Sequence, residues 1–345
     1  MISLPAGPQP GFEAQLNRRR RWKTLLAKSE TLPWNFHSAD PRVGPKFFTG
    51  LTGLATALIL LLLAVLLGYI TQQGAPGLSW HFLSSGTGQG QDSFDTRQAG
   101  VLPMIVGTAA RVLLMTIFVL PVGVITAVYL NEYAASGSWV TRVIRTAVNN
   151  LAGVPSIVFG LFGLGFFINF VGGQLDQLFR PTGAEPLWGQ PALLWASLTL
   201  AVMTLPVVIV ATEESLRSIP PGLREGSLAL GATRLQTIVQ VVLPQALPGI
   251  LTGAILAVSR AAGEVAPILF TGAAYYMATL PKSLTDQFMD LGYHVFVLST
   301  QSPNVEKTRP ILFSTVLVLL LLTFALNAVA IVLRARLRRQ RQIQH

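Results

Sequence analysis

Long apolar runs alternate with short polar segments along most of this chain. At about 1.5 Å per residue, each run is long enough to cross a hydrocarbon core of about 30 Å. None shows the strict alternation of a strand, and backbone groups cannot stay unpaired in lipid, so each run is expected to be a helix. The pattern predicts an all-α membrane protein with six transmembrane helices, at Phe47–Ile70, Gly100–Leu130, Leu151–Val171, Ala192–Thr212, Ala246–Thr271 and Ile311–Leu333.

The composition supports a multi-pass membrane protein. Apolar residues make up 51% of the 345 positions and charged residues only 12%, whereas soluble domains contain about 25% charged residues. The first apolar run begins after a polar tail and is too long for a signal peptide, so none is expected. Because the chain has no cysteine, disulfides and thiolate metal sites are excluded.

The distribution of basic residues predicts the orientation, since cytoplasmic flanks accumulate Lys and Arg. Most of the 25 basic residues precede Phe47, follow Leu333, or lie in segments 131–150 and 213–245. Both termini are therefore predicted to be cytoplasmic. The segments expected on the other side carry only Arg97, Arg180, Lys282, Lys307 and Arg309.

The net charge of +10 and the basic run Arg18–Arg21 also occur in nucleic-acid-binding proteins. Anchoring to an anionic membrane surface accounts for the same charges. The predicted partner is thus the lipid bilayer, and no nucleic acid is expected.

The segments outside the spans differ in character. Residues 1–46 form a basic, Pro-containing tail that cannot bury a core. It is either a solvated tail or one that lays Trp22 and Leu25 on the membrane as a short amphipathic helix. The external loop 71–98 is predicted to be irregular, and a second basic tail follows at 336–345.

The last external segment, 272–308, has a different pattern. Its large apolar residues recur at helical spacing, which predicts a short surface helix. These residues are Leu280, Leu284, Phe288 and Leu291.

Signals for catalysis are nearly absent. No Gly-Lys dipeptide occurs, so the chain lacks the loop that cradles ATP phosphates, and no cofactor is expected in it. The histidines lack metal-ligand spacing, so no metal site is expected and ordinary solvated side chains are predicted. They are His37, His81, His294 and His345.

Three charged residues lie inside predicted spans: Arg111, Arg260 and Glu264. Charges at membrane depth usually face a bundle interior or an aqueous path. Arg260 and Glu264 are one helical turn apart and can pair, either as a structural ion pair or as part of a transport path. Arg111 either joins that path or extends its head group toward the surface. Pro267 is expected to kink the helix beside the pair.

Small residues mark one expected helix contact. Gly249 and Gly253 form a small-xxx-small pair early in the fifth span, where two helix backbones can approach closely. We expect these glycines to serve packing.

The polar break between the fourth and fifth spans contains the sequence EGSLALGATRLQTIVQVVLP, residues 225–244. It resembles the signature loop by which permease subunits of ABC importers grip their ATPase. Glu225 is expected near a helix start, where it favours the dipole or pairs with an Arg. Gly231 permits a turn or a close approach of another molecule, and Pro244 ends the cytoplasmic segment. The resemblance also assigns coupling to Ala232, Thr233, Val241 and Leu243.

The resemblance extends over about residues 75–335. The stretches that carry it include Ala99–Pro103, Tyr129–Tyr133, Val154–Gly163 and Ser259–Thr271. The pattern Gly-Glu-x-Ala-Pro-x-Leu-Phe-Thr in the last of these is similar to A-type (PstA) permease subunits of phosphate importers. The loop departs from the usual Glu-Ala-Ala with Glu225-Gly226-Ser227, and Gly and Ser are poorer helix formers than Ala.

This resemblance implies the type I ABC importer permease fold in a prokaryotic inner membrane. It implies a heterodimer with a C-type permease, an external phosphate-binding protein, and a cytoplasmic ATPase dimer that binds ATP and magnesium. Arg forks suit any tetrahedral anion, so a permease for sulfate or molybdate remains an alternative. A channel or secondary transporter without a motor, and a membrane-embedded enzyme, are further alternatives.

Overall fold

The computed structural model describes residues 43–87, 99–135, 137–181, 183–277, 279–302 and 304–342. Six helical stretches in these ranges are long and apolar enough to cross a membrane, which confirms the predicted number of spans. The predictions for residues 1–42, including the surface helix at Trp22, lie outside the described residues. The spans are Phe47–Gly77, Leu102–Tyr133, Ser156–Phe179, Leu193–Arg217, Arg234–Gly263 and Val305–Arg336.

Several spans are built from more than one helical segment. The α-helices are α2 (Val43–Gly74), α3 (Trp80–Ser84), α4 (Leu102–Val128), α5 (Trp139–Leu151), α6 (Ser156–Phe162), α7 (Gly173–Phe179), α8 (Leu193–Arg217), α9 (Pro221–Ala229), α10 (Arg234–Thr237), α11 (Leu243–Gly263), α12 (Leu291–Thr300) and α13 (Val305–Gln342). Three wider π-helical segments, η3 (Tyr129–Tyr133), η4 (Gly163–Gly172) and η5 (Ile238–Val242), and one 3₁₀ turn, η1 (Ala75–Gly77), connect them.

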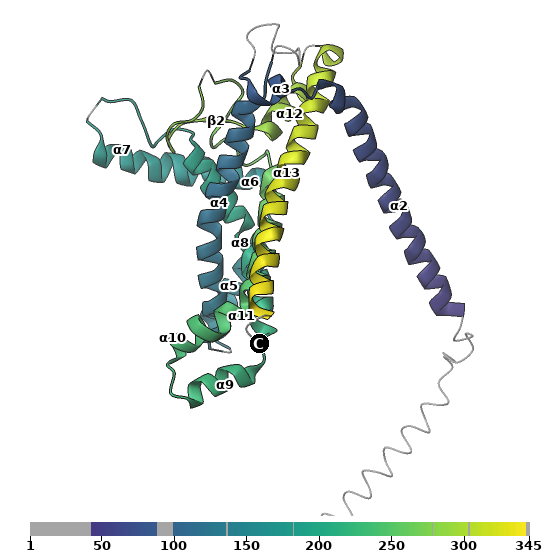
Figure 1. Ribbon diagram of the computed structural model, residues 1–345. Helices are drawn as coiled ribbons and strands as arrows, with labels where there is room; N and C mark the ends of the chain where they lie inside the picture. The colour runs from purple at the N-terminus through teal and green to yellow at the C-terminus, as the bar shows by residue number, and fades with distance from the viewer. Residues whose placement is uncertain are drawn as a thin grey trace, which may run out of the picture. The chain divides into compact units, whose positions relative to one another are not determined.

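The chain divides into two compact units, one ending at Leu66 and one beginning at Leu67. The described part of the first unit is α2 up to Leu66. In the second unit, α8 packs against α4 and α11, and α11 also packs against α13 (Figure 1). Apolar residues of α4, α8 and α11 form the main core of this bundle; they include Val112, Met115, Leu200, Met203, Val208, Ala257 and Ala261.

Close helix approach in this bundle depends on glycines. A Cβ on Gly249 would overlap the Ser215 side chain, and a Cβ on Gly253 would lie 2.9 Å from Cβ of Ala211. The hydroxyl of Ser215 donates to the Ala246 carbonyl at 2.8 Å. The predicted small-residue pair therefore lies where α11 packs directly against α8.

The fifth span differs from its prediction at both ends. It begins at Arg234 rather than Ala246 and ends at Gly263 rather than Thr271. Pro244 does not end a cytoplasmic segment, because it lies in the first turn of α11, directly after η5. A proline lacks the N–H that a regular α-helical turn requires. Here the helix continues through Pro244, and the turn that precedes it, η5, is a wider π-helical turn.

Pro267 does not kink this helix, because the helix has already ended at Gly263. Residues after Gly263 form turns instead, in which the Pro267 carbonyl accepts from the Thr271 hydroxyl at 2.9 Å. The apolar run continues through this segment, so hydropathy alone extended the predicted helix too far.

The surface helix predicted from Leu280 to Leu291 is wrong. The helix of this region is α12, which starts at Leu291, while Leu280 and Leu284 lie in an exposed loop. Phe288 belongs to β2 (Phe288–Met289), which pairs in parallel with β1 (Ala273–Ala274). The carbonyl of Met289 occupies the space left by Gly107 on α4, where a Cβ would overlap it. Phe288 and Met289 are thus buried in an extended segment that packs against α4, and they do not form part of a helix.

The loop predicted to be irregular at 71–98 is partly helical. α2 continues to Gly74, and α3 follows with Ser79 as its N-cap, whose hydroxyl accepts from the Phe82 N–H at 3.0 Å. Phe82 is fully buried, which fixes this short helix against the bundle. Residues 88–98 of the loop lie outside the described residues.

Candidate functional site

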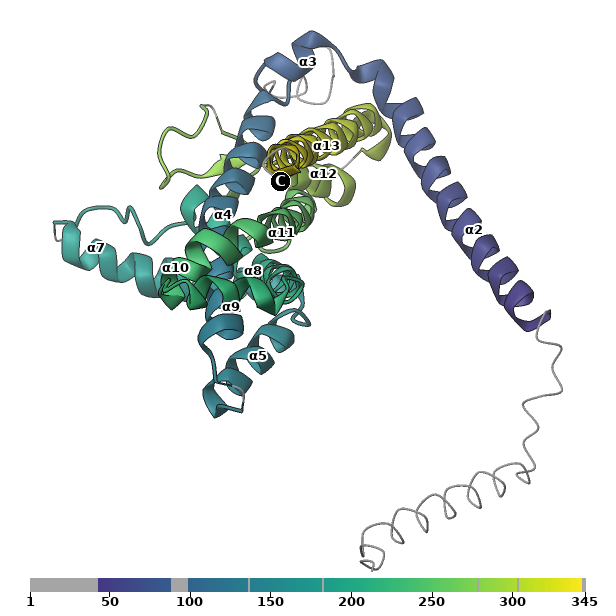
Figure 2. The same cartoon turned by 60° about the horizontal axis from the view of Figure 1, so that its bottom comes forward.

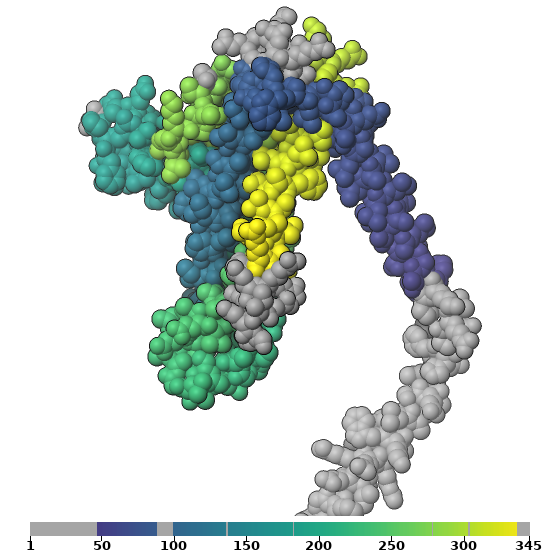
Figure 3. All heavy atoms as spheres, in the orientation of Figure 1, coloured from purple at the N-terminus to yellow at the C-terminus, as the bar shows by residue number. Residues whose placement is uncertain are grey.

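The loop between α8 and α11 forms a protruding tip of the second unit (Figures 1 and 3). It consists of α9, a turn at Gly231 and α10. Gly231 has φ of +86°, a conformation that side chains with a Cβ rarely adopt. Thr233 then caps α10, because its hydroxyl accepts from the Gln236 N–H and the Gln236 side chain accepts from the Thr233 N–H at 2.8 Å. This turn therefore sets the angle between the two short helices.

Charged contacts fix this tip to the end of the second span. Arg224 donates to Glu132 at 2.8 Å and to the carbonyls of Leu216 and Ile219, both at 2.9 Å. Arg234 donates to the Glu132 carbonyl and lies over the Tyr133 ring, 5.1 Å from its centre. The tip is thus anchored to η3 and to the end of α8.

The outer face of the tip is apolar and uncovered. Leu230 is 91% exposed and Leu235 63% exposed, and Leu228 and Val239 add to the same loop. A loop of this size that exposes several large apolar side chains marks an interaction surface rather than a plain connection.

Glu225 does not lie at the helix start that the sequence suggested. α9 begins at Pro221, so its first turn contains no acidic residue. Glu225 is exposed, and among the described residues it has no ion pair or hydrogen bond. The neighbouring Arg224 pairs with Glu132 instead. Glu225 is therefore free to contact another molecule.

The remaining residues of the signature differ in position. Ala232 is half-buried in the turn, whereas Val241, Leu243 and Pro244 belong to the continuous helical run of the fifth span and are half-buried there. The signature thus covers both the tip and the start of the helix that carries Arg260.

Arg111 lies fully buried in the bundle and does not extend toward the surface. Its Nε donates to the Asp290 carboxylate at 2.6 Å, and both side chains are inaccessible to solvent. Its terminal nitrogens donate to the carbonyls of Ala261 at 2.8 Å and Ala262 at 3.2 Å. Thr108 donates to the same carboxylate at 2.8 Å. Arg111 therefore joins α4, the last turn of α11 and the start of α12.

Arg260 and Glu264 pair as their spacing predicted, with 3.6 Å between Nε and Oε1. The pair stands at the end of α11, since Glu264 is its C-cap with an extended backbone. Their side chains are 38% and 23% exposed. Next to them, the Ser259 hydroxyl donates to the Asn327 side-chain oxygen of α13 at 2.9 Å. The pair is therefore partly exposed, whereas Arg111, which contacts the carbonyls of the same helix end, is fully buried.

His294 is not the solvated histidine that the sequence predicted. It is 7% exposed, and its ring stacks on Tyr275 with centres 5.6 Å apart. Neither ring nitrogen has a partner among the described residues. Burial without a partner disfavours the charged form and lowers the pKa of His294 to about 4. The ring is neutral at physiological pH.

Residues 119–340 match the family described as the binding-protein-dependent transport system inner membrane component. The chain belongs to this family. This permease is 32% identical over 278 residues to the probable ABC transporter permease protein YqgI of Bacillus subtilis, covering 77% of this chain and 87% of that protein. It is 40% identical over 170 residues to the phosphate transport system permease protein PstA 1 of Mycobacterium tuberculosis, covering 49% and 50% of the two chains.

The fold of the permease is shared with a solved structure. A bacterial ABC transporter involved in the import of the acidic polysaccharide alginate matches with a TM-score of 0.58 at 16% identity, covering 85% of this chain and 96% of that chain. The permease is thus a transport subunit of an ABC importer and lies in the membrane through several spans. A partner ATPase and a substrate-binding protein follow from membership of this family.

Sequence reasoning missed three carboxylates that position the permease's cations. Glu132 holds Arg224 of the loop between α8 and α11, Asp290 holds Arg111, and Glu213 accepts from Arg145 at 3.0 Å and from Arg217 at 3.1 Å. The Arg217–Glu213 pair has helical spacing, which was a usable signal. The other pairs join residues far apart in the chain, and no local pattern reveals them.

Proposed function

We propose that this permease is the A-type subunit of an importer that moves inorganic phosphate into the cell by alternating access. The observation that carries the proposal is its 40% identity over 170 residues to a phosphate transport system permease. A C-type permease completes a heterodimer, and an external phosphate-binding protein delivers the anion. An ATPase dimer, which binds ATP and magnesium, docks on the cytoplasmic side.

The anion path in this proposal passes Arg260 and Glu264. Their partial exposure leaves the guanidinium accessible, and the adjacent carboxylate offsets part of its charge. A guanidinium fork suits a tetrahedral oxyanion, and partial neutralisation keeps a divalent anion from binding too tightly. Arg111 supports the path indirectly, because its hydrogen bonds hold the carbonyls of Ala261 and Ala262 beside Arg260.

In this proposal the ATPase binds to the tip formed by α9, the turn at Gly231 and α10, which we call the coupling loop. Its exposed Leu230 and Leu235 supply apolar area, and the unpaired Glu225 supplies a charge for the contact. The anchor through Arg224 and Glu132 passes motion of the ATPase to the second span.

The double variant Arg260→Met with Glu264→Gln tests the path. Replacing both partners avoids leaving one charge unpaired at this partly exposed position. The variant is expected to assemble with its partners, to retain ATP hydrolysis, and to lose phosphate uptake by at least about tenfold, the effect of about 1.4 kcal/mol. Arg260→Lys serves as a graded control, because it keeps the charge and loses the planar fork.

Uptake by the assembled double variant at the wild-type level would reject the role of this pair and leave it as scaffold. The transported anion is tested separately, by reconstituting the complete importer and measuring which of phosphate, sulfate and molybdate enters vesicles. Entry of sulfate or molybdate in place of phosphate would assign the permease to another oxyanion.

A further inference from the structure

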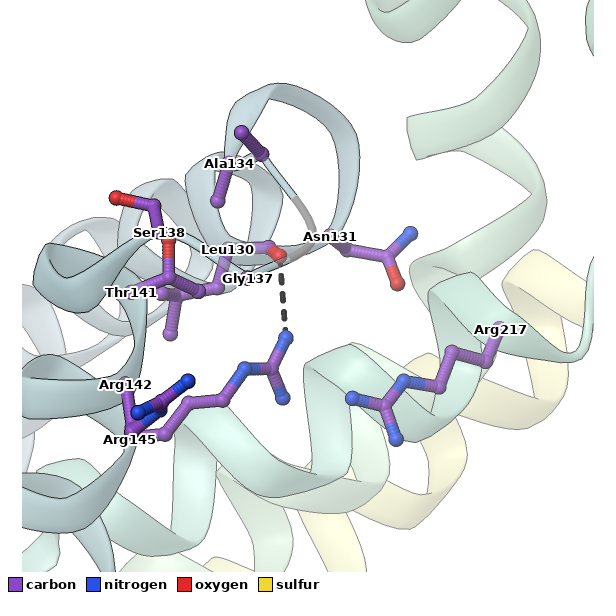
Figure 4. A pocket seen from close by; sticks show the side chains of 10 residues that line it. Leu130, Asn131, Ala134, Gly137, Ser138, Thr141, Arg142, Arg145 and Arg217 are labelled. Atoms are coloured by element: carbon purple, nitrogen blue, oxygen red, sulfur yellow. Dashed lines mark hydrogen bonds between the residues drawn. The ribbon is translucent and has the colours of Figure 1, made fainter.

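A polar cavity of about 500 Å³ lies at the same end of the bundle as the coupling loop. It opens between the end of the second span, α5 and the last turn of α8 (Figure 4). The polar side chains that line it are Asn131, Ser138, Thr141, Arg142, Arg145 and Arg217. Neither the coupling loop nor the Arg260–Glu264 pair contributes to it.

Cations outnumber anions around this cavity. Arg145 and Arg217 both donate to a single carboxylate oxygen of Glu213, at 3.0 and 3.1 Å, and Arg145 also donates to the Leu130 carbonyl at 3.1 Å. Figure 4 shows these two guanidinium groups reaching toward one another across the cavity from α5 and α8. Glu213 thus offsets one of the two positive charges.

Arg142 adds a further positive charge to the same cavity. It is exposed, and no carboxylate among the described residues lies within ion-pair distance of it. The hydroxyls of Ser138 and Thr141 also line the cavity and have no hydrogen-bond partner among the described residues. The Arg142 guanidinium and the hydroxyls of Ser138 and Thr141, which have no partner in the described part of the chain, therefore line a polar space.

We propose that this cavity binds a phosphate group. Guanidinium groups are the preferred partners of phosphate, because their donors match its oxygens in pairs. The remaining positive charge suits a monoanionic or dianionic group. The cavity volume of about 500 Å³ accommodates a phosphate group together with water, since water occupies about 30 Å³ per molecule. Two sources offer the same chemistry: inorganic phosphate on the coupling-loop side, and the headgroup of an anionic phospholipid.

Occupancy of this site is linked to the coupling loop. Asn131, which lines the cavity, donates to the Glu132 carboxylate at 2.8 Å. The same carboxylate anchors Arg224 of α9. A phosphate group bound to Asn131 is therefore linked through Glu132 to Arg224, which lies in the loop that receives the ATPase in the proposed function. The proposal is independent of which anion the importer carries.

Binding is measured on the full-length permease with its partner subunits, purified in phospholipid-free detergent. In one arm, inorganic phosphate is titrated by calorimetry, with sulfate and chloride as comparison anions. In the other, the complex is returned to bilayers with and without phosphatidylglycerol, and retained lipid is identified by native mass spectrometry. The test variants are Arg142→Gln and the double change Arg142→Gln with Arg217→Gln.

The matched control is Arg336→Gln, an exposed arginine of α13 that does not line the cavity. The double variant is expected to bind one of the two probes at least about tenfold more weakly than wild type, the usual effect of losing a charge-assisted hydrogen bond. The arm that shows the loss identifies the source. Arg142→Gln alone is expected to weaken the same probe, and because Arg142 has no contact to lose, it keeps the test independent of folding.

Equal binding of both probes by wild type and Arg142→Gln would overturn the proposal, as would a wild type that binds neither probe. Loss of binding in Arg336→Gln to the same degree would also overturn it, because the effect would then be one of general charge.

Discussion

At the scale of single residues, the enclosed pair of Arg111 and Asp290 is the most consequential polar feature of the second unit. Both side chains are excluded from solvent, and every hydrogen bond of the guanidinium goes to Asp290, Ala261 or Ala262. A buried ion pair is costly to desolvate and is weak evidence for stability by itself. Its value here is geometric, because one side chain fixes three chain segments that are far apart in sequence.

Removing only the anion from this pair is therefore expected to destabilise the permease. Asp290→Ala leaves Arg111 buried without a countercharge, which costs about 3–5 kcal/mol. Thermal unfolding of the detergent-solubilised protein measures the loss. Glu214→Ala provides the control, since that carboxylate is exposed and expected to change stability little. An Asp290→Ala protein as stable as the control would show that the guanidinium finds water or another partner.

The sequence predicted only one of these two ion pairs. Arg260 and Glu264 are one turn apart, so helix geometry alone predicted their contact. Arg111 and Asp290 are 179 residues apart, and their contact depends on how the segment after α11 folds back onto α4. Hydropathy does not reveal that α11 ends at Gly263, because the run from there to Thr271 is as apolar as the helix before it.

At the scale of elements, the coupling loop depends on one backbone conformation. Gly231 has φ of +86°, and no atom lies within 4 Å of a Cβ built on it, apart from its chain neighbours. The glycine is thus required by the turn and not by a close neighbour within this chain. The sequence predicted the turn, but the anchor of the loop through Glu132 needed the structure.

Two substitutions at Gly231 separate strain from steric exclusion. Gly231→Ala adds only the cost of the left-handed backbone, about 1 kcal/mol, and is expected to retain most transport. Gly231→Trp adds a bulky side chain to the exposed tip and is expected to abolish ATPase-driven uptake while the permease remains in the membrane. Uptake in reconstituted vesicles and co-purification of the ATPase are the two measurements. Normal transport by Gly231→Trp would exclude the tip from the ATPase contact.

At the scale of the whole molecule, the six spans follow from hydropathy because membrane insertion is a local property of each run. The orientation in the membrane stays a prediction from the basic residues. Within the second unit, the loop between α8 and α11 and the end of α13 lie at one end of the bundle, and α3 and α12 at the other (Figure 2 and Figure 1). The basic residues predict that the end with the loop faces the cytoplasm.

Single cysteines test this orientation directly, because the natural chain has none. Glu185→Cys, in the exposed loop between α7 and α8, is expected to react with a membrane-impermeant thiol reagent added to intact cells. Leu230→Cys and Arg336→Cys are expected to react only after the membrane is permeabilised. Asp290 is unsuitable as a reporter of the outer side, since it is buried. Reaction of Leu230→Cys in intact cells would reverse the topology.

The fifth span connects the loop between α8 and α11 to the region of the buried Arg111. Its 30 residues run without a break from Arg234, in the tip formed by α9 and α10, to Gly263, close to Arg260 and Arg111. At about 1.5 Å per residue the run measures about 45 Å. We expect a rod of this length to act as a lever. Arg111 holds its far end through the carbonyls of Ala261 and Ala262, and its near end contains the wider turn of η5. A tilt of the near end is then expected to rotate the rod about the far end, close to Arg260.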